Sequence, residues 1–297
     1  MTELASPRKV KQVRNSPALD SWRRLWHRPV AVVSMVVLLL IIGIAIFADL
    51  IVPYSQAITP AGGVSKLLAP SAEHWFGTDY YGRDLFARVI HGTRIDILMS
   101  VSATAVSITL GTILACLCAH FGGKVDNVIM RIADVLSSIP GLVMALAICA
   151  GIGRGMWQLI VAMILGTISI HLRMIRSAAL GVGGMEYIES AKALGASTGF
   201  IMRKHYLHNI ISVILIQATQ NISINITIGA TLSFIGLGVK SPTPEWGMLL
   251  SEGLDYLMVN PWAAIFPGIF VVVTALAVST FGDCLRDALD PKLKGKA

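Results

Sequence analysis

The stretch EYIESAKALGASTGFIMRKHYLHN, residues 186–209, is a charged interval between two long apolar runs. Helix-forming residues fill Glu186 to Leu194, and Gly195 followed by small residues is typical of a helix C-cap and turn before a second helical start. The pattern therefore predicts a helix, a bend and another helix. Because its charged side chains are too costly to place in hydrocarbon, the segment is expected at a membrane surface, facing a soluble compartment.

The apolar runs on either side of this stretch belong to a strongly apolar chain. Of its 297 residues, 55% are apolar and only 14% are charged, against roughly 25% charged residues in a soluble domain. We therefore predict an all-α integral membrane protein. The net charge of +7 does not indicate nucleic-acid binding, because the basic residues are scattered over short loops and the amino terminus.

Six apolar runs are long enough to cross a membrane as helices. They cover approximately residues 29–52, 95–120, 128–152, 156–175, 210–235 and 263–281. Pro140 and Gly141 are expected to kink the third of these helices. The segments predicted on the inner side hold most of the 24 lysines and arginines, which places both termini and the stretch 186–209 in the cytoplasm.

These runs divide the chain into five predicted parts. A basic cytoplasmic segment covers residues 1–28, and the first transmembrane helix covers residues 29–52. An outer, periplasmic loop with an interfacial helix follows over residues 53–94. A five-helix core, residues 95–285, contains the cytoplasmic loop 180–208, and a cytoplasmic tail covers residues 286–297.

Two of the spans carry patterns that repeat every four residues and therefore lie on one helix face. In the second span the repeated residues, such as Ser107 and Gly111, are small, which predicts a close helix neighbour. In the fifth span they are Gln217, Asn221 and Asn225. Three carboxamides on one face must look away from lipid. Two interpretations stay open: these side chains form hydrogen bonds between helices, or they line a watery translocation path.

The chain carries few signs of chemistry of its own. It has no G-x-x-x-x-G-K-[ST] phosphate loop and no H-E-x-x-H zinc motif, so we expect a non-catalytic chain that binds no nucleotide, metal or other cofactor itself. The stretch 186–209 is interpreted as a docking surface. A short amphipathic helix that turns Tyr187, Ile188, Ala191 and Leu194 toward a groove fits a helix-in-groove contact, and a solvated loop between spans is the simpler alternative.

The charged stretch also resembles a family signature, Glu-Ala-Ala, three residues, Gly, nine residues, Ile-x-Leu-Pro. The matching residues are Glu189, Ala191, Gly195 and Leu207, whereas Ser190, His205 and His208 depart from it. Three further blocks are FGTDYYGRD (76–84), LSFIGLGVKSPTPEWG (232–247) and GDCLRDALDPKL (282–293). Together these motifs resemble the C-type permease subunits of binding-protein-dependent ABC importers in the dipeptide, oligopeptide and nickel class.

The resemblance implies an ABC importer type I permease fold in the bacterial inner membrane, with about six transmembrane helices. It implies that the cytoplasmic loop couples to an ATPase. The coupling residues would be Glu186, Tyr187, Glu189, Ala191, Leu194, Gly195 and Ala196. ATP and Mg would be bound by one or two separate ATPase subunits. A second homologous permease would complete the path, and a periplasmic or lipid-anchored solute-binding protein would deliver the substrate.

Short peptides are the expected substrate of such a chain, and nickel chelates or another small solute are the alternative. A stand-alone secondary transporter is the rival from a different class of protein. That rival would need coupling-ion groups in mid-membrane, where the predicted spans are nearly free of acidic residues.

Overall fold

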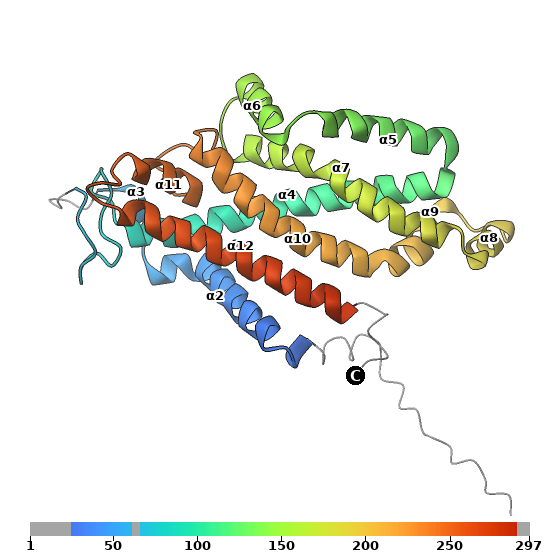
Figure 1. Ribbon diagram of the computed structural model, residues 1–297, viewed down its shortest axis with the longest axis horizontal. Helices are drawn as coiled ribbons and strands as arrows, with labels where there is room; N and C mark the ends of the chain where they lie inside the picture. The colour runs from blue at the N-terminus through green and yellow to red at the C-terminus, as the bar shows by residue number, and fades with distance from the viewer. Residues whose placement is uncertain (1–24, 61–65, 290–297) are drawn as a thin grey trace, which may run out of the picture.

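The computed structural model describes residues 25–60 and 66–289, and within them the chain is helical, without a β-strand (Figure 1). Most of the predicted segment 1–28 and the end of the predicted tail 286–297 lie outside these residues. The helices are α2 Pro29–Ile51, α3 Tyr54–Ile58, α4 Leu85–Phe121, α5 Gly123–Ser138, α6 Gly141–Ile152, α7 Met156–Gly183, α8 Glu186–Ala193, α9 Thr198–Ile201, the π-helix η1 Met202–Tyr206, α10 Leu207–Phe234, α11 Trp246–Leu254 and α12 Trp262–Leu289.

Five of these helical segments are long and apolar enough to cross a membrane: α2, α4, α7, the continuous run from α9 to α10, and α12. The broken pair α5 and α6 makes a sixth span if it is counted as one. The predicted all-α architecture of about six spans is therefore confirmed.

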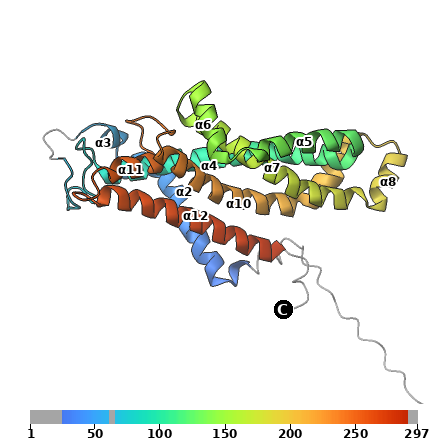
Figure 2. The same cartoon turned by 45° about the horizontal axis from the view of Figure 1, so that its top comes forward.

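The predicted kink of the third span is a sharp bend between α5 and α6, which meet at 87°. Pro140 has no backbone N–H and disfavours a helical conformation at the residue before it. Ile139 accordingly takes extended backbone angles. As a result α6 leaves the direction of α5 and projects from the bundle beside one end of α7 (Figure 2).

The second span is longer than expected, because α4 is one helix of 37 residues that begins at Leu85. Its N-cap is Asp84, whose carboxylate accepts a hydrogen bond from the Ala87 amide at 2.8 Å, as such caps commonly do. The expected interfacial helix and the second span are therefore one continuous element, and the predicted boundary near residue 95 falls inside it.

α4 and α7 pack side by side along much of their length. The hydroxyl oxygens of Ser107 and Thr167 lie 3.1 Å apart between them. One turn further, a Cβ on Gly111 would lie only 3.3 Å from the Cβ of His171, so a small residue is needed at this crossing. The close neighbour predicted for the small face is α7. On the other side, α10 and α12 pack together, and α2 packs against α12 and α4 (Figure 1).

A buried network of charged side chains joins the segment before α4, α4 itself and α11. Arg83 Nε and Arg88 Nη1 donate to the same oxygen of Asp79, at 2.6 and 3.1 Å. Both arginines also donate to Glu252 Oε2, at 3.2 and 3.1 Å. Because the two guanidinium groups and Asp79 are buried, this network fixes how α11 lies on the predicted outer end of α4.

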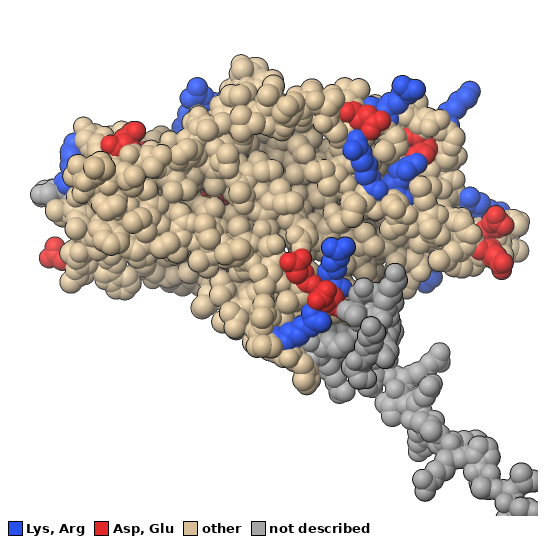
Figure 3. Space-filling view, in the orientation of Figure 1, with Lys and Arg blue, Asp and Glu red and all other residues tan. Residues whose placement is uncertain are grey.

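The two ends of the bundle carry different short helices. α8 lies at the opposite end from α3 and α11 (Figure 1). Arg28, just before α2, pairs with Asp287 near the end of α12, so the first and last spans have these ends on the same side of the bundle. Charged side chains gather toward the ends, and the surface between them is mostly uncharged (Figure 3). This is the charge distribution expected of a helical bundle that crosses a bilayer.

Candidate functional site

The stretch 186–209 folds as the predicted helix, bend and helix. α8 ends at Ala193 with Leu194 as its C-cap, and Gly195 follows with a φ of +77°, a conformation that glycine adopts at little cost. The amides of Gly195 and Ala196 donate to the carbonyls of Lys192 and Ala191, both at 3.0 Å, which satisfies carbonyls at the end of α8.

Ser197 begins the second helix of the stretch. Its hydroxyl accepts a hydrogen bond from the Phe200 amide at 3.3 Å and caps α9. Residues 195–199 read GASTG, which formally matches the G-x-S-x-G pattern of hydrolases. A nucleophile elbow requires a strand before the serine, whereas here a helix and a turn precede it. Ser197 is a helix cap in this structure.

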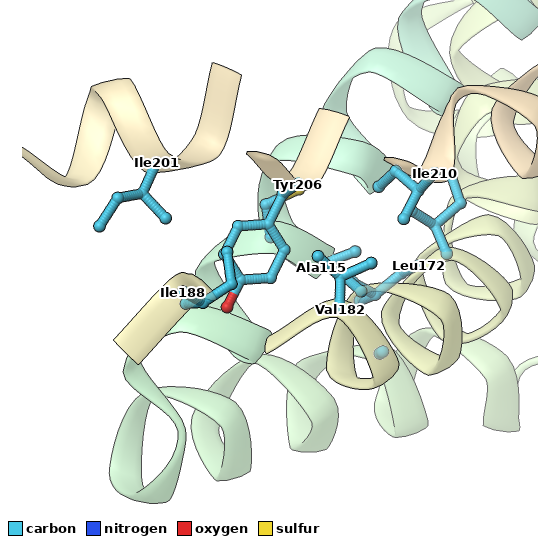
Figure 4. Close-up of a cluster of buried hydrophobic side chains, with 11 residues drawn as sticks. Ala115, Leu172, Val182, Ile188, Ile201, Tyr206 and Ile210 are labelled. Atoms are coloured by element: carbon cyan, nitrogen blue, oxygen red, sulfur yellow. The ribbon is translucent and has the colours of Figure 1, made fainter. Parts of the chain in front are cut away.

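α8 has one buried face and one exposed face. Ile188 is fully buried against Ile201 and Tyr206 in a cluster that also contains Val182 at the end of α7 (Figure 4). Ile188 was expected to point into a partner's groove, and this expectation is wrong: the side chain attaches α8 to its own bundle. The cluster is the reason why the charged stretch holds a defined position next to the spans.

The predicted coupling residues are distributed over both faces. Those on the exposed face are Glu186, Tyr187, Glu189, Leu194 and Gly195, while Ala191 and Ala196 are half-buried and pack against the cluster. The Leu194 side chain is 88% exposed. The exposed face therefore offers an apolar group at the C-terminal tip of α8, while its glutamates lie in the first turn.

Tyr206 anchors the stretch to the spans, and the sequence interpretation did not single it out. Its side chain is fully buried, and its hydroxyl donates to the Ala119 carbonyl at 3.3 Å near the end of α4. A second contact joins Thr198 Oγ1 to His120 Nε2 at 3.2 Å. From Thr198 the helix continues through η1 into α10, so α8 is connected to a membrane span by packed side chains and by continuous helix.

Gly183, the last residue of α7, gives a test of this anchor. A Cβ at this position would lie 2.8 Å from the Tyr206 hydroxyl, so Gly183→Ala is expected to destabilise the chain by about 1–3 kcal/mol through overpacking. Gly183→Ala combined with Tyr206→Phe should recover much of that loss, because the clashing oxygen is removed. Thermal unfolding followed with a thiol-reactive dye measures this, because the four cysteines are buried and free.

The matched control is the neighbouring glycine, Gly184. A Cβ there would meet its nearest neighbour, the Leu180 carbonyl oxygen, at 4.0 Å, so Gly184→Ala is expected to leave the unfolding midpoint nearly unchanged. Equal losses for Gly183→Ala and Gly184→Ala, or a double variant no better than Gly183→Ala, would contradict the role given to Tyr206.

The carboxamide face of α10 is turned toward α4. Asn221 and Asn225 are buried, and both Nδ2 groups donate to Thr104 Oγ1, at 3.3 and 3.0 Å. Gln217 is half-buried one turn away. This geometry is that of hydrogen bonding between helices, which was one of the two interpretations. A translocation path lined by these residues stays a prediction.

His208 stands where the resembling signature has Pro. It is an exposed residue in the first turn of α10, within the continuous helical run that begins at Thr198. His205, three residues earlier, lies with its ring centroid 5.6 Å from that of Tyr187. The structure gives no physical account of a particular role for His208.

A family model described as "Binding-protein-dependent transport system inner membrane component" matches residues 107–295, more than half of the chain. The chain belongs to this family. A second family model, "N-terminal TM domain of oligopeptide transport permease C", matches residues 16–70. The first match contains α8, its turn and α10, so the candidate site lies within the region that matches the family. The predicted bacterial inner-membrane location is confirmed by this membership together with the apolar spans.

Three curated relatives align with nearly the whole chain. Glutathione transport system permease protein GsiD of Pectobacterium atrosepticum is 38% identical over 285 residues, which cover 96% of this chain and 94% of the relative. Probable D,D-dipeptide transport system permease protein DdpC of Escherichia coli is 37% identical over 294 residues (99% and 98%). Dipeptide transport system permease protein DppC of Alkalihalophilus pseudofirmus is 36% identical over 279 residues (94% and 91%).

The fold is also similar to a solved one. A chain of the MetNI methionine ABC transporter, in an inward-facing conformation, superimposes with a TM-score of 0.52 at 18% sequence identity. The match covers 69% of this chain and 98% of that chain. The predicted ABC importer permease fold is therefore confirmed. The predicted membership of the ABC importer permeases is confirmed by the family models and the relatives.

Proposed function

We propose that the chain is the transmembrane permease subunit of an ATP-driven importer that carries short peptides. The observation that supports this most directly is the tip of α8: an exposed apolar side chain, Leu194, on a helix that is packed against the spans and joined to α10. A helix of this kind fits a groove on a soluble partner. The partner is a cytoplasmic ATPase subunit. The transporter has one or two such subunits, and they, rather than this chain, bind ATP and Mg.

Force applied to α8 by such a partner has two routes into the membrane domain. One route passes through the buried contacts of Ile188 and Tyr206 to the ends of α4 and α7. The other follows the continuous helical run from Thr198 into α10. Because both routes are packed or helical, a movement of α8 changes how α10 lies against α4 and α7 and thereby alternates access to the path.

The names of the relatives support the proposed substrate class. All three carry names of transport systems for glutathione, D,D-dipeptides or dipeptides, and short peptides are the solute class that these names share. This supports peptides over nickel chelates. A second homologous permease completes the path, and a periplasmic or lipid-anchored solute-binding protein delivers the peptide.

Reconstitution tests the proposal. The chain, its second permease and its ATPase subunits are placed in proteoliposomes with the solute-binding protein, and uptake of a radiolabelled dipeptide and of glutathione is measured. Uptake is expected to need ATP and every one of these subunits. Uptake by this chain alone under a proton or sodium gradient would instead establish a secondary transporter.

Gly195 gives a sharper prediction about coupling. Its φ of +77° costs an L-residue about 1–2 kcal/mol, so Gly195→Ala is expected to shift Leu194 from its position and to lower substrate-stimulated ATP hydrolysis while membrane insertion stays normal. Gly199→Ala is the matched control, because Gly199 lies in α9 without a left-handed φ, and a Cβ at either glycine would meet no atom within 4 Å. Normal stimulation in Gly195→Ala would argue against a coupling role for this turn.

A further inference from the structure

Two buried carboxyl groups meet where α11 begins against α4. Asp96, in α4, is 3% exposed, and Glu245, the N-cap of α11, is fully buried. Asp96 Oδ2 accepts a hydrogen bond from the Trp246 amide at 3.0 Å. The two Glu245 oxygens accept from the amides of Gly247 and Met248, at 2.9 and 2.8 Å. Because these three amides are successive and belong to one helical turn, about 5.4 Å long, they hold the two acids next to each other, within reach of a shared hydrogen bond.

Tight packing surrounds this pair. Trp246 is fully buried, and its Nε1–H donates to the Val89 carbonyl of α4 at 3.0 Å. A Cβ on Gly92 of α4 would lie 3.0 Å from the Trp246 ring. One on Gly247 would lie 2.3 Å from the Ala230 carbonyl oxygen of α10. The start of α11 is therefore held closely between α4 and α10, and the charge of the pair must be balanced inside the protein.

The charged groups of the surrounding helices do not balance it. Among the described residues, no arginine, lysine or histidine forms a salt bridge with either acid. The titratable residue of α10 is His208, exposed in its first turn, and the charged residues of α12 lie at positions 283–287, at its opposite end. The other such groups near this end of the bundle are bonded to other partners, as are His91, Arg88, Arg94 and Glu252, or exposed, as are Asp255, Arg154 and Lys240.

Two ionised carboxylates in such a place would repel each other, whereas a single proton between them replaces the repulsion by a hydrogen bond. Glu245 is the better place for the remaining negative charge. It accepts two amide hydrogen bonds at the N-terminus of α11, and Asp96 accepts one. We propose that Asp96 and Glu245 form a proton-binding site, in which Asp96 keeps its proton and donates it to the Glu245 carboxylate, and that this proton fastens α11 to α4.

Such a site makes the stability of the chain depend on pH. In the unfolded chain both carboxyl groups are solvated and ionise above their usual pKa values of about 4. Unfolding near neutral pH therefore releases the proton that the folded chain holds. Because the unfolded state binds fewer protons than the folded one, stability falls as the pH rises, by about tenfold in the folding equilibrium constant per pH unit for one proton. The junction of α11 with α4, at the predicted outer end of the bundle, weakens in the same direction.

Three variants separate this proton from other contributions to the pH dependence. Asp96→Asn imitates the protonated acid, because its amide oxygen still accepts from Trp246 and its NH₂ group donates to Glu245. It is expected to be about as stable as the parent chain near pH 6 and to lose the tenfold decrease per pH unit between about pH 6 and pH 8. Asp255→Asn, at the exposed C-cap of α11, is the matched control and should keep the parent's slope. Glu245→Gln has one oxygen for two amides and should be less stable at every pH.

Two measurements on the full chain test the proposal. The unfolding equilibrium is followed by tryptophan fluorescence in mixed micelles of lipid and denaturing detergent. Infrared spectra in nanodiscs report the proton itself, because a protonated carboxylic acid has a C=O stretch that ionised carboxylates lack. This band is expected in the difference spectrum of the parent chain minus Asp96→Asn at neutral pH.

Four results would overturn the proposal. One is the absence of the infrared band, and another is a pH slope in Asp96→Asn equal to that of the parent chain. A third is an Asp96→Asn chain that is much less stable than the parent near pH 6, or less stable than Glu245→Gln, because the proton would then not be held by Asp96. The fourth is a stability that follows the concentration of Na⁺ or Ca²⁺ in place of pH, because a cation would then balance the pair.

Discussion

Replacing Arg88 by Ala is expected to lower the free energy of unfolding by about 3 kcal/mol, at the lower end of the range for breaking a buried ion pair. The Arg88 side chain is fully buried and donates to Asp79 and Glu252 at 3.1 Å each. Its removal leaves two carboxylates to share the guanidinium of Arg83. Asp79 is also buried, so its charge cannot be compensated by water.

The loss is kept to the lower end of that range by Arg83, which stays bonded to both carboxylates. Arg88→Lys should give an intermediate loss, because a single ammonium is a point charge and does not present the planar fork that reaches two acceptors at once. The temperature midpoint of unfolding distinguishes the parent protein, Arg88→Ala and Arg88→Lys. It is measured by the reaction of the buried cysteines with a thiol dye.

The control is Arg28, which pairs with Asp287 near the end of α12. The side chains of Arg28 and Asp287 are 44% and 51% exposed. An exposed pair contributes about 0–1 kcal/mol, so Arg28→Ala should barely move the midpoint. If Arg88→Ala is no less stable than Arg28→Ala, the buried network does not hold α11 on α4.

What the sequence predicted well depends on local physics. The apolar runs, the bend at Pro140 and the turn at Gly195 each follow from a property of a few adjacent residues: a stretch long enough to cross hydrocarbon, a missing N–H, or a left-handed φ. These features agree with the structure. Periodicity also placed Asn221 and Asn225 on one face of their helix.

Periodicity could not identify what that face contacts. Thr104, the acceptor for both asparagines, is 117 residues from Asn221, and Glu252 is 164 residues from Arg88. Ile188 was misplaced for the same reason: an amphipathic pattern shows that an apolar side is covered, but its cover here is the chain's own α7 and η1. Long-range partners of this kind are set by tertiary packing and leave no local signal.

Replacing Leu194 by Lys is expected to abolish stable binding of the ATPase subunit while leaving this chain as stable as before. Leu194 is 88% exposed, and substitution of a solvated side chain changes stability by roughly 0.5 kcal/mol or less. Lysine is chosen because a cation near the C-terminus of α8 does not oppose the helix dipole. If the side chain fills an apolar groove, the loss should reach at least about 2 kcal/mol, or roughly 30-fold in Kd.

Met258→Lys is the matched control for that variant. Met258 is 96% exposed and lies in the segment between α11 and α12, at the opposite end of the bundle from α8 (Figure 1). The same apolar-to-cationic change is therefore made on the side away from the proposed ATPase contact. Copurification of the ATPase and its Kd for the two variants decide the matter. Undiminished binding by Leu194→Lys would mean that the ATPase contacts this chain elsewhere than the tip of α8, whereas loss in both variants would point to a general effect of added charge on assembly.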